Sequence, residues 1–219
     1  MRDRSAPLTE ADIGTLAWDK MGGLLPALVQ DRRTGRVLML GYMNRETLAA
    51  TLGTSLATFF SRSKQRLWQK GETSGNRLQV RGVFTDCDDD ALLVLADPEG
   101  PACHLGTPSC FEAEPAGPGW LSELSAIIAE RAGSGDASSY TRKLLDEGPE
   151  RIGKKIGEEG VEVALAGVSR DAAGCAEEVA DLVYHVSVLM KARDFGWDDV
   201  VDLLKARHAK ASNAPTASS

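Results

Sequence analysis

The sequence predicts two domains, a β-rich α+β domain in the N-terminal half and an all-α helical bundle in the C-terminal half. Apolar runs of strand length fill the first half, whereas apolar residues after Trp120 recur with the 3.6-residue period of helices. Charge divides in the same way. Residues 1–110 carry 13 basic and 13 acidic side chains, and residues 111–219 carry 12 and 19, so the net charge of −7 lies in the second half. We therefore expect two units with different tasks.

Short strands and turns account for the first half. Residues 24–31 and 36–43 are apolar runs of strand length, separated by the turn-forming stretch DRRTG. Asn44 is a favourable N-cap, which predicts a short helix over residues 44–52. Further strands are predicted at residues 57–63, 67–72, 78–86 and 91–97. This mixture is typical of an α+β unit.

Amphipathic segments with the helical period make up the second half. They predict helices over residues 121–133, 139–148, 150–168, 172–194 and 198–210. Residues 112–120 carry two prolines and two glycines without periodicity, which indicates a linker. We therefore divide the chain into a domain at 1–111, a linker at 112–120, a domain at 121–210 and a disordered tail at 211–219.

Composition narrows the location and the partners. The N-terminal stretch has no apolar signal-peptide core, and no run approaches the roughly 18–20 apolar residues of a membrane span, so we expect a cytoplasmic protein that does not bind membranes. The acidic second half argues against nucleic acid as a partner, but it allows phosphates to bind through divalent cations. Thiols stay reduced in the cytosol, so clustered cysteines there are expected to bind metal.

Three cysteines occur close together in the first domain. Cys87, Cys103 and Cys110 offer three thiolates, which suit zinc with one coordination position to spare. An open position would hold a reactive water, whereas a fourth protein ligand would make the site structural. His104 could be that ligand, but it adjoins Cys103, and adjacent residues tend to point apart. Spacing alone leaves a structural and a catalytic zinc site equally open.

Three aspartates alternate around the first of these cysteines. If residues 86–90 continue a strand, Asp86, Asp88 and Asp90 share one face and Cys87 points to the other. Three carboxylates on one face repel unless a cation gathers them, and oxygen ligands favour Mg²⁺ or Ca²⁺. An EF-hand loop is excluded, because Ala91 stands where that loop needs glycine. An exposed acidic edge strand remains the simpler alternative.

The stretch FFSRSKQRLWQKGETSGN lies upstream of the aspartates. Cations, hydroxyls and a glycine turn suit phosphate groups, although each residue alone is more often part of a solvated loop. The candidate substrate-binding residues here are Arg62, Lys70, Thr73, Ser74 and Asn76.

Several motifs in residues 24–111 occur in the order found in one enzyme family. The motifs VQD-x-x-TG-x-VLML-x-YMN, SRS-x-x-x-LW-x-KGETSGN, DCD-x-D and ACH…SCF closely resemble phosphoribosyl-AMP cyclohydrolase of histidine biosynthesis. The resemblance implies hydrolytic opening of the adenine ring between N1 and C6. It also implies a homodimer whose zinc sites are built from both subunits. The implied ligands are Cys87, Cys103 and Cys110 for Zn²⁺, and Asp86, Asp88 and Asp90 for Mg²⁺.

The chemistry of ring opening fits these residues. Zinc lowers the pKa of bound water to about 7, which supplies hydroxide for attack at C6. A group must also move protons to the departing N1, and His104 is the catalytic candidate because it adjoins a zinc ligand. A purely structural hydrogen bond is the alternative role for His104.

Carboxylates on predicted helices form a second candidate site. Glu158 and Glu162 lie one helical turn apart, and Glu178 and Asp181 share a face of the next helix. Apolar neighbours would pack the two helices antiparallel, so that the acidic faces meet. Acidic helix faces are usually solvated surface, but this spacing within apolar stretches favours a Mg²⁺ site.

The helical half resembles the all-α MazG-like pyrophosphohydrolases. The motifs SYTRKLLDEG, RIGKKIGEEGVEVALA and EVADLVYHVSVLM narrow this resemblance to phosphoribosyl-ATP pyrophosphohydrolase, over about residues 121–208. It implies Mg²⁺ ligands at Glu158, Glu159, Glu162, Glu178 and Asp181. We assign Glu159 a catalytic role as well, and Lys154 and Lys155 are candidate phosphate-binding residues. The metal would activate water for attack at an α–β phosphate link.

The two resemblances, reached from different residues, describe consecutive steps of one pathway. The helical domain would make phosphoribosyl-AMP and the first domain would open its ring. Two hypotheses compete with this one. The first is a house-cleaning nucleoside-triphosphate pyrophosphohydrolase with a zinc accessory domain, and the second is a non-enzymatic zinc-clipped binding module on a helical dimerisation domain.

Overall fold

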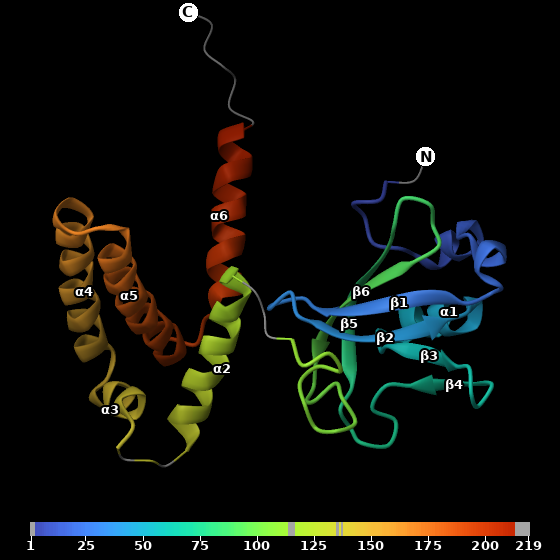
Figure 1. Ribbon diagram of the computed structural model, residues 1–219, viewed down its shortest axis with the longest axis horizontal. Coiled ribbons are helices and arrows are strands. Elements are labelled where there is room, and N and C mark those ends of the chain that lie inside the picture. The colour runs from blue at the N-terminus through green and yellow to red at the C-terminus, as the bar shows by residue number, and fades with distance from the viewer. Residues whose placement is uncertain (1–2, 114–116, 135, 137, 213–219) are drawn as a thin grey trace, which may run out of the picture. The chain divides into compact units, whose positions relative to one another are not determined.

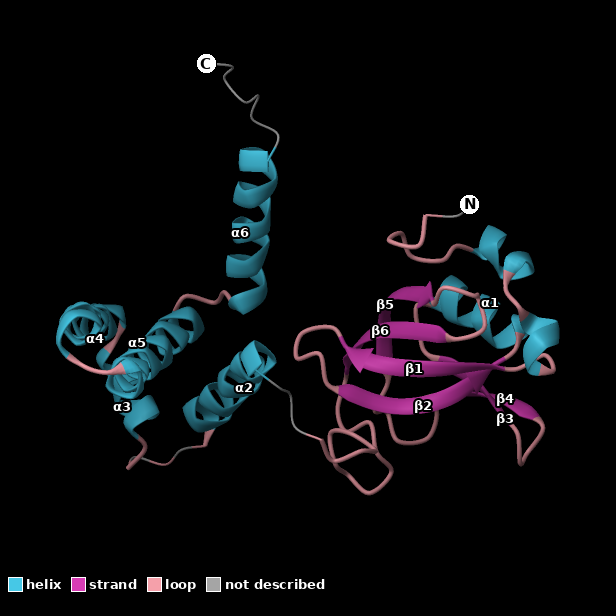
Figure 2. Cartoon of the chain, turned by 45° about the horizontal axis from the view of Figure 1, so that its top comes forward, coloured by secondary structure: helices cyan, strands magenta, loops and turns pink. Residues whose placement is uncertain are grey.

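The computed structural model describes residues 3–113, 117–134, 136 and 138–212. Its contacts divide the chain into two units, Met1–Gly119 and Trp120–Ser219 (Figure 1). All strands of the described residues belong to the first unit, and the second unit is helical (Figure 2). The predicted two-part layout is therefore confirmed. No helix among the described residues combines the length and apolar character that crossing a membrane requires.

Residues 3–113 of the first unit form two sheets and one α-helix. A four-stranded sheet has the order β2-β1-β6-β5, and a separate hairpin pairs β3 with β4. Strand β1 is parallel to β6 and antiparallel to β2, and β5 is antiparallel to β6. The strands are β1 (Leu25–Asp31), β2 (Val37–Met43), β3 (Thr58–Ser61), β4 (Arg66–Gln69), β5 (Leu78–Thr85) and β6 (Leu92–Pro98). The helices are the 3₁₀-helices η1 (Glu10–Thr15) and η2 (Trp18–Met21), α1 (Arg45–Thr54) and a short 3₁₀-turn at the end of the unit, η3 (Gly117–Gly119).

One face of the large sheet forms the core of the first unit. Alternate residues such as Ala27, Val29 and Val94 are fully buried, because strand side chains point to opposite faces in turn. Leu48 of α1 and Trp18 of η2 pack in the same cluster. Asn44 caps α1 as predicted, since its side chain accepts a hydrogen bond from the Thr47 N–H at 2.8 Å.

The opposite sheet face is also apolar but only partly covered. Leu28 pairs with Leu40 on one side and with Leu93 on the other, and Leu93 pairs with Phe84. These four residues form an apolar row across all four strands, which we call the outer row. Leu40 is 46% exposed and the others are half-buried.

The described residues of the second unit form five α-helices: α2 (Trp120–Gly133), α3 (Tyr140–Glu147), α4 (Pro149–Ser169), α5 (Ala172–Ala192) and α6 (Trp197–Ser212). Ile128, Leu144, Ile152 and Val188 form its core. Proline at the first position of α4 and Asp171 as the N-cap of α5 are favourable starts. The predicted helices therefore form with boundaries close to those expected.

Three boundaries differ from expectation. Trp120 begins α2 and does not belong to the linker, of which residues 114–116 lie outside the described residues. Helix α6 extends to Ser212, so the expected tail does not start at residue 211, and residues 213–219 lie outside the description. The prediction that strand structure continues through residues 86–90 is wrong. Strand β5 ends at Thr85 and a turn follows, with Asp89 in the left-handed conformation at φ 60°.

Candidate functional sites

A cavity of about 450 Å³ lies at one end of the large sheet in the first unit. Its wall brings together four of the five predicted substrate-binding residues and two of the three cysteines. The lining includes Lys70, Thr73, Ser74, Asn76, Cys103, His104 and Cys110. The fifth predicted residue, Arg62, does not line this cavity, because its guanidinium stacks on the Tyr42 ring at 3.9 Å from the ring centroid.

The turn from Lys70 to Asn76 forms the polar side of the cavity. The Lys70 ammonium donates a hydrogen bond to the Asn76 carbonyl at 3.2 Å, which closes the turn. Gly71 has φ +85°, and a Cβ there would lie 2.6 Å from the Asn76 carbonyl carbon and oxygen. The backbone approaches itself too closely for any side chain at this position.

Alanine substitutions at the two glycines of this turn should separate conformational strain from steric overlap. Gly75 also has a left-handed φ, +78°, but open space around it. Gly75→Ala is expected to lower the free energy of unfolding by about 1–2 kcal/mol through strain alone. Gly71→Ala should lower it by about 1–3 kcal/mol more, because the Asn76 backbone must also move. Urea unfolding followed by tryptophan fluorescence measures both, and equal losses would contradict the close approach.

The loop that follows β6 and carries Cys103 and Cys110, which we call the cysteine loop, forms the other side of the cavity. The Cys110 N–H donates to the Leu38 carbonyl at 2.8 Å, and the Ser109 hydroxyl donates to the Val37 carbonyl at 2.7 Å. These bonds tie the loop to the first residues of β2. His104 is exposed, with its Nδ1 4.0 Å from the Cys103 Sγ.

The two cavity cysteines differ in their electrostatics. The Leu105 N–H points at the Cys103 Sγ from 3.5 Å, and this contact lowers the pKa of the Cys103 thiol. Desolvation, and then the neighbouring Cys103, raise the pKa of Cys110. Cys103 therefore loses its proton more readily than Cys110, and the thiolate is the form that binds metal.

Cys87 does not join the other two cysteines within one chain. It lies in the turn between Thr85, which pairs with Leu92, and the start of β6. The cysteine loop follows Pro98 at the other end of β6, and the seven residues of that strand span about 20 Å. Among the described residues, Cys87, Cys103 and Cys110 form no cluster of metal-binding size.

The turn at residues 86–90 nevertheless gathers the three predicted carboxylates. Oxygens of Asp86, Asp88 and Asp90 all lie within 4.8 Å of one another. Asp86 Oδ1 accepts hydrogen bonds from the backbone N–H groups of Asp90 at 3.1 Å and Ala91 at 3.3 Å, which shapes the turn. We call residues 86–90 the acidic turn. The carboxylates converge because the chain turns here. They do not lie on one face of a strand, as the sequence had suggested, because β5 ends at Thr85.

Lys20 of η2 is a site residue that the sequence did not indicate. Its ammonium forms ion pairs with both Asp88 and Asp90. These pairs raise the pKa of Lys20 and lower the pKa of Asp88. Only the parallel pairing of β1 with β6 brings η2 beside the acidic turn, and no local pattern predicts that pairing.

The second unit has a carboxylate cluster between α4 and α5. Oxygens of Glu159, Glu178 and Asp181 lie within 4.8 Å of one another, and Glu159 is only 6% exposed. Glu162 is not among the carboxylates within this distance, but Coulombic repulsion from Glu159, with desolvation, raises the pKa of Glu162. Glu158 instead pairs with Lys155 at 2.9 Å and Lys154 at 3.9 Å. The structure does not bring Glu158 into the cluster.

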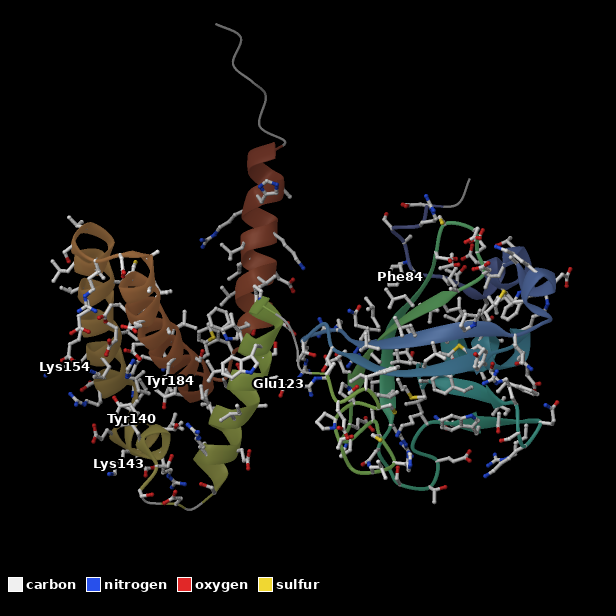
Figure 3. All side chains as sticks on the ribbon, viewed as in Figure 1. Phe84, Glu123, Tyr140, Lys143, Lys154 and Tyr184 are labelled. Atoms are coloured by element: carbon white, nitrogen blue, oxygen red, sulfur yellow. The ribbon has the colours of Figure 1, made fainter. Side chains whose placement is uncertain are left out.

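Basic and aromatic side chains surround this cluster. Lys155 pairs with Glu159 at 3.1 Å, and Arg170 pairs with Glu178 at 2.5 Å. Lys154 projects from the outer side of α4 (Figure 3). Sequence reasoning missed Arg170, which sits at the C-terminal end of α4 and carries no motif signal of its own.

Buried His185 holds the inner side of the cluster. Its Nδ1 lies 2.9 Å from the Asp181 carbonyl and 3.7 Å from Glu159 Oε1, and its Nε2 lies 3.1 Å from the Tyr140 hydroxyl. Tyr140 and Tyr184 lie close together beside it (Figure 3). The Tyr184 hydroxyl in turn bonds the Thr141 hydroxyl at 2.8 Å. Helix α3 is thus fixed to the helix that carries two of the carboxylates.

Two protein families match the two units separately. The phosphoribosyl-AMP cyclohydrolase family matches residues 39–112, and the phosphoribosyl-ATP pyrophosphohydrolase family matches residues 121–208.

Full-length relatives carry both parts in one chain. A protein of Xanthomonas axonopodis pv. citri called "Histidine biosynthesis bifunctional protein HisIE" is 54% identical over 197 residues, covering 90% of this chain and 94% of its own. Proteins with the same name from Photobacterium profundum and Yersinia pestis are 48% and 49% identical, covering 90% and 93% of this chain and 99% and 100% of their own.

Proposed function

We propose that two separate metal sites divide the work in this chain, which belongs to the family of bifunctional histidine-biosynthesis proteins. The C-terminal domain hydrolyses phosphoribosyl-ATP to phosphoribosyl-AMP and pyrophosphate. The N-terminal domain then opens the adenine ring of phosphoribosyl-AMP. The observation that carries the two-site proposal is that each unit gathers its own set of metal-binding side chains.

The cavity of the first unit is the proposed place of ring opening. The adjacent thiols of Cys103 and Cys110, of which Cys103 loses its proton more readily, are a donor set that suits Zn²⁺. Bound zinc supplies a water of lowered pKa. Lys70 and the hydroxyls of Thr73 and Ser74 hold the substrate at the opposite wall, and exposed His104 moves the proton to the departing N1.

A second copy of the chain is needed to complete this site. Cys87 and the acidic turn lie at one end of the sheet, and the cavity lies at the other. The partly covered outer row offers an apolar surface between them. Two outer rows could pack face to face about a twofold axis that runs across the strands. The end of one sheet that carries the acidic turn would then lie beside the end of the other sheet that carries the cavity. Cys87 of the partner subunit then meets Cys103 and Cys110, and this happens twice in each homodimer.

Mixing two inactive variants should test this arrangement. Cys87→Ala and Cys103→Ala are each expected to abolish ring opening. Co-refolded at equal amounts, they should recover about a quarter of the wild-type rate, since half of the dimers are mixed and each has one intact site. The measurement is ring opening with phosphoribosyl-AMP. No recovery above either variant alone would mean that one chain supplies all three cysteines.

The carboxylate cluster of the second unit is the proposed place of pyrophosphate release. Glu159, Glu178 and Asp181 are a set of oxygen donors that suits Mg²⁺, and Glu162 interacts electrostatically with Glu159. Mg²⁺ held by these carboxylates would neutralise charge on the substrate phosphates and make the attacked phosphorus more electrophilic. Lys155 can leave its carboxylate partners for the substrate phosphates, and Lys154 lies within the same turn of helix. His185, whose Nδ1 lies 3.7 Å from Glu159 Oε1, helps to hold the Glu159 carboxylate in position.

The acidic turn is the proposed Mg²⁺ site of the first unit, where the metal would neutralise a substrate phosphate.

The helical domain is proposed to be MazG-like, on the basis of its two facing acidic helices. A cytoplasmic location is supported by the four cysteines, all of which are free thiols.

The competing hypotheses are separated by one assay. Phosphoribosyl-ATP and ordinary deoxynucleoside triphosphates are offered to the zinc- and magnesium-loaded chain, and pyrophosphate and ring-opened product are followed together. A house-cleaning enzyme would prefer the deoxynucleotides, and a binding module would release neither product. The paired family matches disfavour both. We expect phosphoribosyl-ATP to give pyrophosphate first and ring-opened product after it, and the deoxynucleoside triphosphates to give neither product.

A further inference from the structure

The Lys20 ammonium lies between two of the three carboxylates that converge in the acidic turn. It contacts both Asp88 and Asp90, two of the three aspartates whose oxygens converge there. The residue comes from η2, 68 positions before Asp88, and has no place in the ring-opening chemistry described above.

We propose that Lys20 is an internal counter-cation that holds the acidic turn ready in the metal-free chain and is displaced when a divalent cation binds. This inference rests on the proposed Mg²⁺ site at the acidic turn. Three carboxylates within 4.8 Å repel one another, and a positive charge among them offsets that repulsion. A divalent ion carries twice the charge and takes oxygen ligands, so it competes for the same atoms.

The backbone around Lys20 is fixed, so that only its side chain has to move. Trp18 is 1% exposed, and its indole N–H donates to the Ile13 carbonyl at 2.7 Å. The Ala17 N–H donates to the Asp89 carbonyl at 2.8 Å, which joins the start of η2 directly to the acidic turn. Gly22 ends η2 in the left-handed conformation.

The Lys20 side chain itself is free to leave. It is 51% exposed, its partner Asp88 is 54% exposed and its partner Asp90 is 20% exposed, so water reaches the ammonium and can first replace the ion pair with Asp88. Exposed ion pairs are individually weak. The turn also keeps its shape without them, because Asp86 Oδ1 still accepts the Asp90 and Ala91 N–H groups. Displacement therefore exchanges one cation for another within a turn that stays formed.

Metal titration of Lys20 variants tests the proposal. We use Mn²⁺ as the probe and follow the free ion by electron paramagnetic resonance in the full zinc-loaded chain. Asp88→Asn first identifies which class of binding sites belongs to the acidic turn. Lys20→Met should then tighten Mn²⁺ binding in that class on the order of tenfold, because two weak ion pairs no longer compete. Lys20→Arg keeps the charge and should bind Mn²⁺ with nearly wild-type affinity.

Lys64→Met is the matched control, because it removes one positive charge from the β3–β4 turn without touching the acidic turn. It should leave the affinity unchanged. Unchanged or weaker Mn²⁺ binding in Lys20→Met would overturn the inference while leaving the metal site in place. If Asp88→Asn removes no class of binding sites, the proposed metal site itself fails, which is a distinguishable result. Thermal unfolding of each variant confirms that the comparison is between folded proteins.

Discussion

Cys103→Ala should abolish ring opening and leave pyrophosphate release within about twofold of wild type. Cys103 lies in the cavity wall, and its thiol loses its proton more readily than that of Cys110. Loss of a residue that merely supports a metal ligand costs about 10–100-fold in metal affinity or activity, so loss of a ligand should cost at least about 100-fold. The carboxylate cluster belongs to the other unit and keeps all its side chains.

Both activities have to be measured on the same preparation. Phosphoribosyl-AMP is supplied for ring opening and phosphoribosyl-ATP for pyrophosphate release, and zinc is determined by elemental analysis. Cys175→Ala is the matched control, because it removes the same thiol from α5, which belongs to the other unit, and Cys175 neither lines the cavity nor belongs to the carboxylate cluster. It should keep both activities and the zinc. Loss of both activities in folded Cys103→Ala would be incompatible with two separate sites.

Glu159→Gln is expected to show the reverse pattern. Pyrophosphate release should fall at least about 100-fold, because an amide replaces the most buried carboxylate of the cluster and binds a hard cation less well. Folding should be retained, because glutamine has nearly the shape of glutamate, and the loss of the Lys155 ion pair is offset by relief of the repulsion of Glu162. Ring opening should continue when phosphoribosyl-AMP is supplied directly, and stop when phosphoribosyl-ATP is the only substrate.

Two further variants make the Glu159 result specific. Glu177→Gln changes the same charge on exposed surface of α5, next to Glu178, and should leave pyrophosphate release intact. Glu158→Gln tests the ligand that the resemblance implies but the structure places beside Lys154 and Lys155. We expect a smaller loss there than for Glu159→Gln. Equal losses in all three variants would point to net charge, and not to a metal position, as the cause.

The helical site was largely predictable from the sequence because helix geometry is local. A spacing of three residues puts Glu178 and Asp181 on one face wherever the helix lies. Sequence could not decide between Glu158 and Glu159, which lie about 100° apart around the helix. That choice depends on how α4 is rotated against α5, and packing of residues such as Ile152 sets the rotation.

The first site was less predictable because it depends on pairings between distant segments. The acidic residues were identified correctly as a convergent group, but for the wrong reason. Where a β-ladder stops is set by its partner strand, and aspartate tolerates the left-handed conformation that Asp89 adopts. The ion pairs of Lys20 follow from the order β2-β1-β6-β5, which no local pattern predicts. Cys87 is separated from the other cysteines by the length of β6, a strand that the sequence did predict.

The parallel pairing of β1 with β6 also determines when the first unit can fold. Ala27 pairs with Leu92, so the central strands meet only after the intervening segment has been synthesised. Closing so long a loop costs entropy before its contacts form, which makes such sheets slow to fold. The helical unit relies mainly on contacts between consecutive helices and should fold quickly once it leaves the ribosome. The enzyme that acts second in the pathway is therefore made first but is expected to mature last.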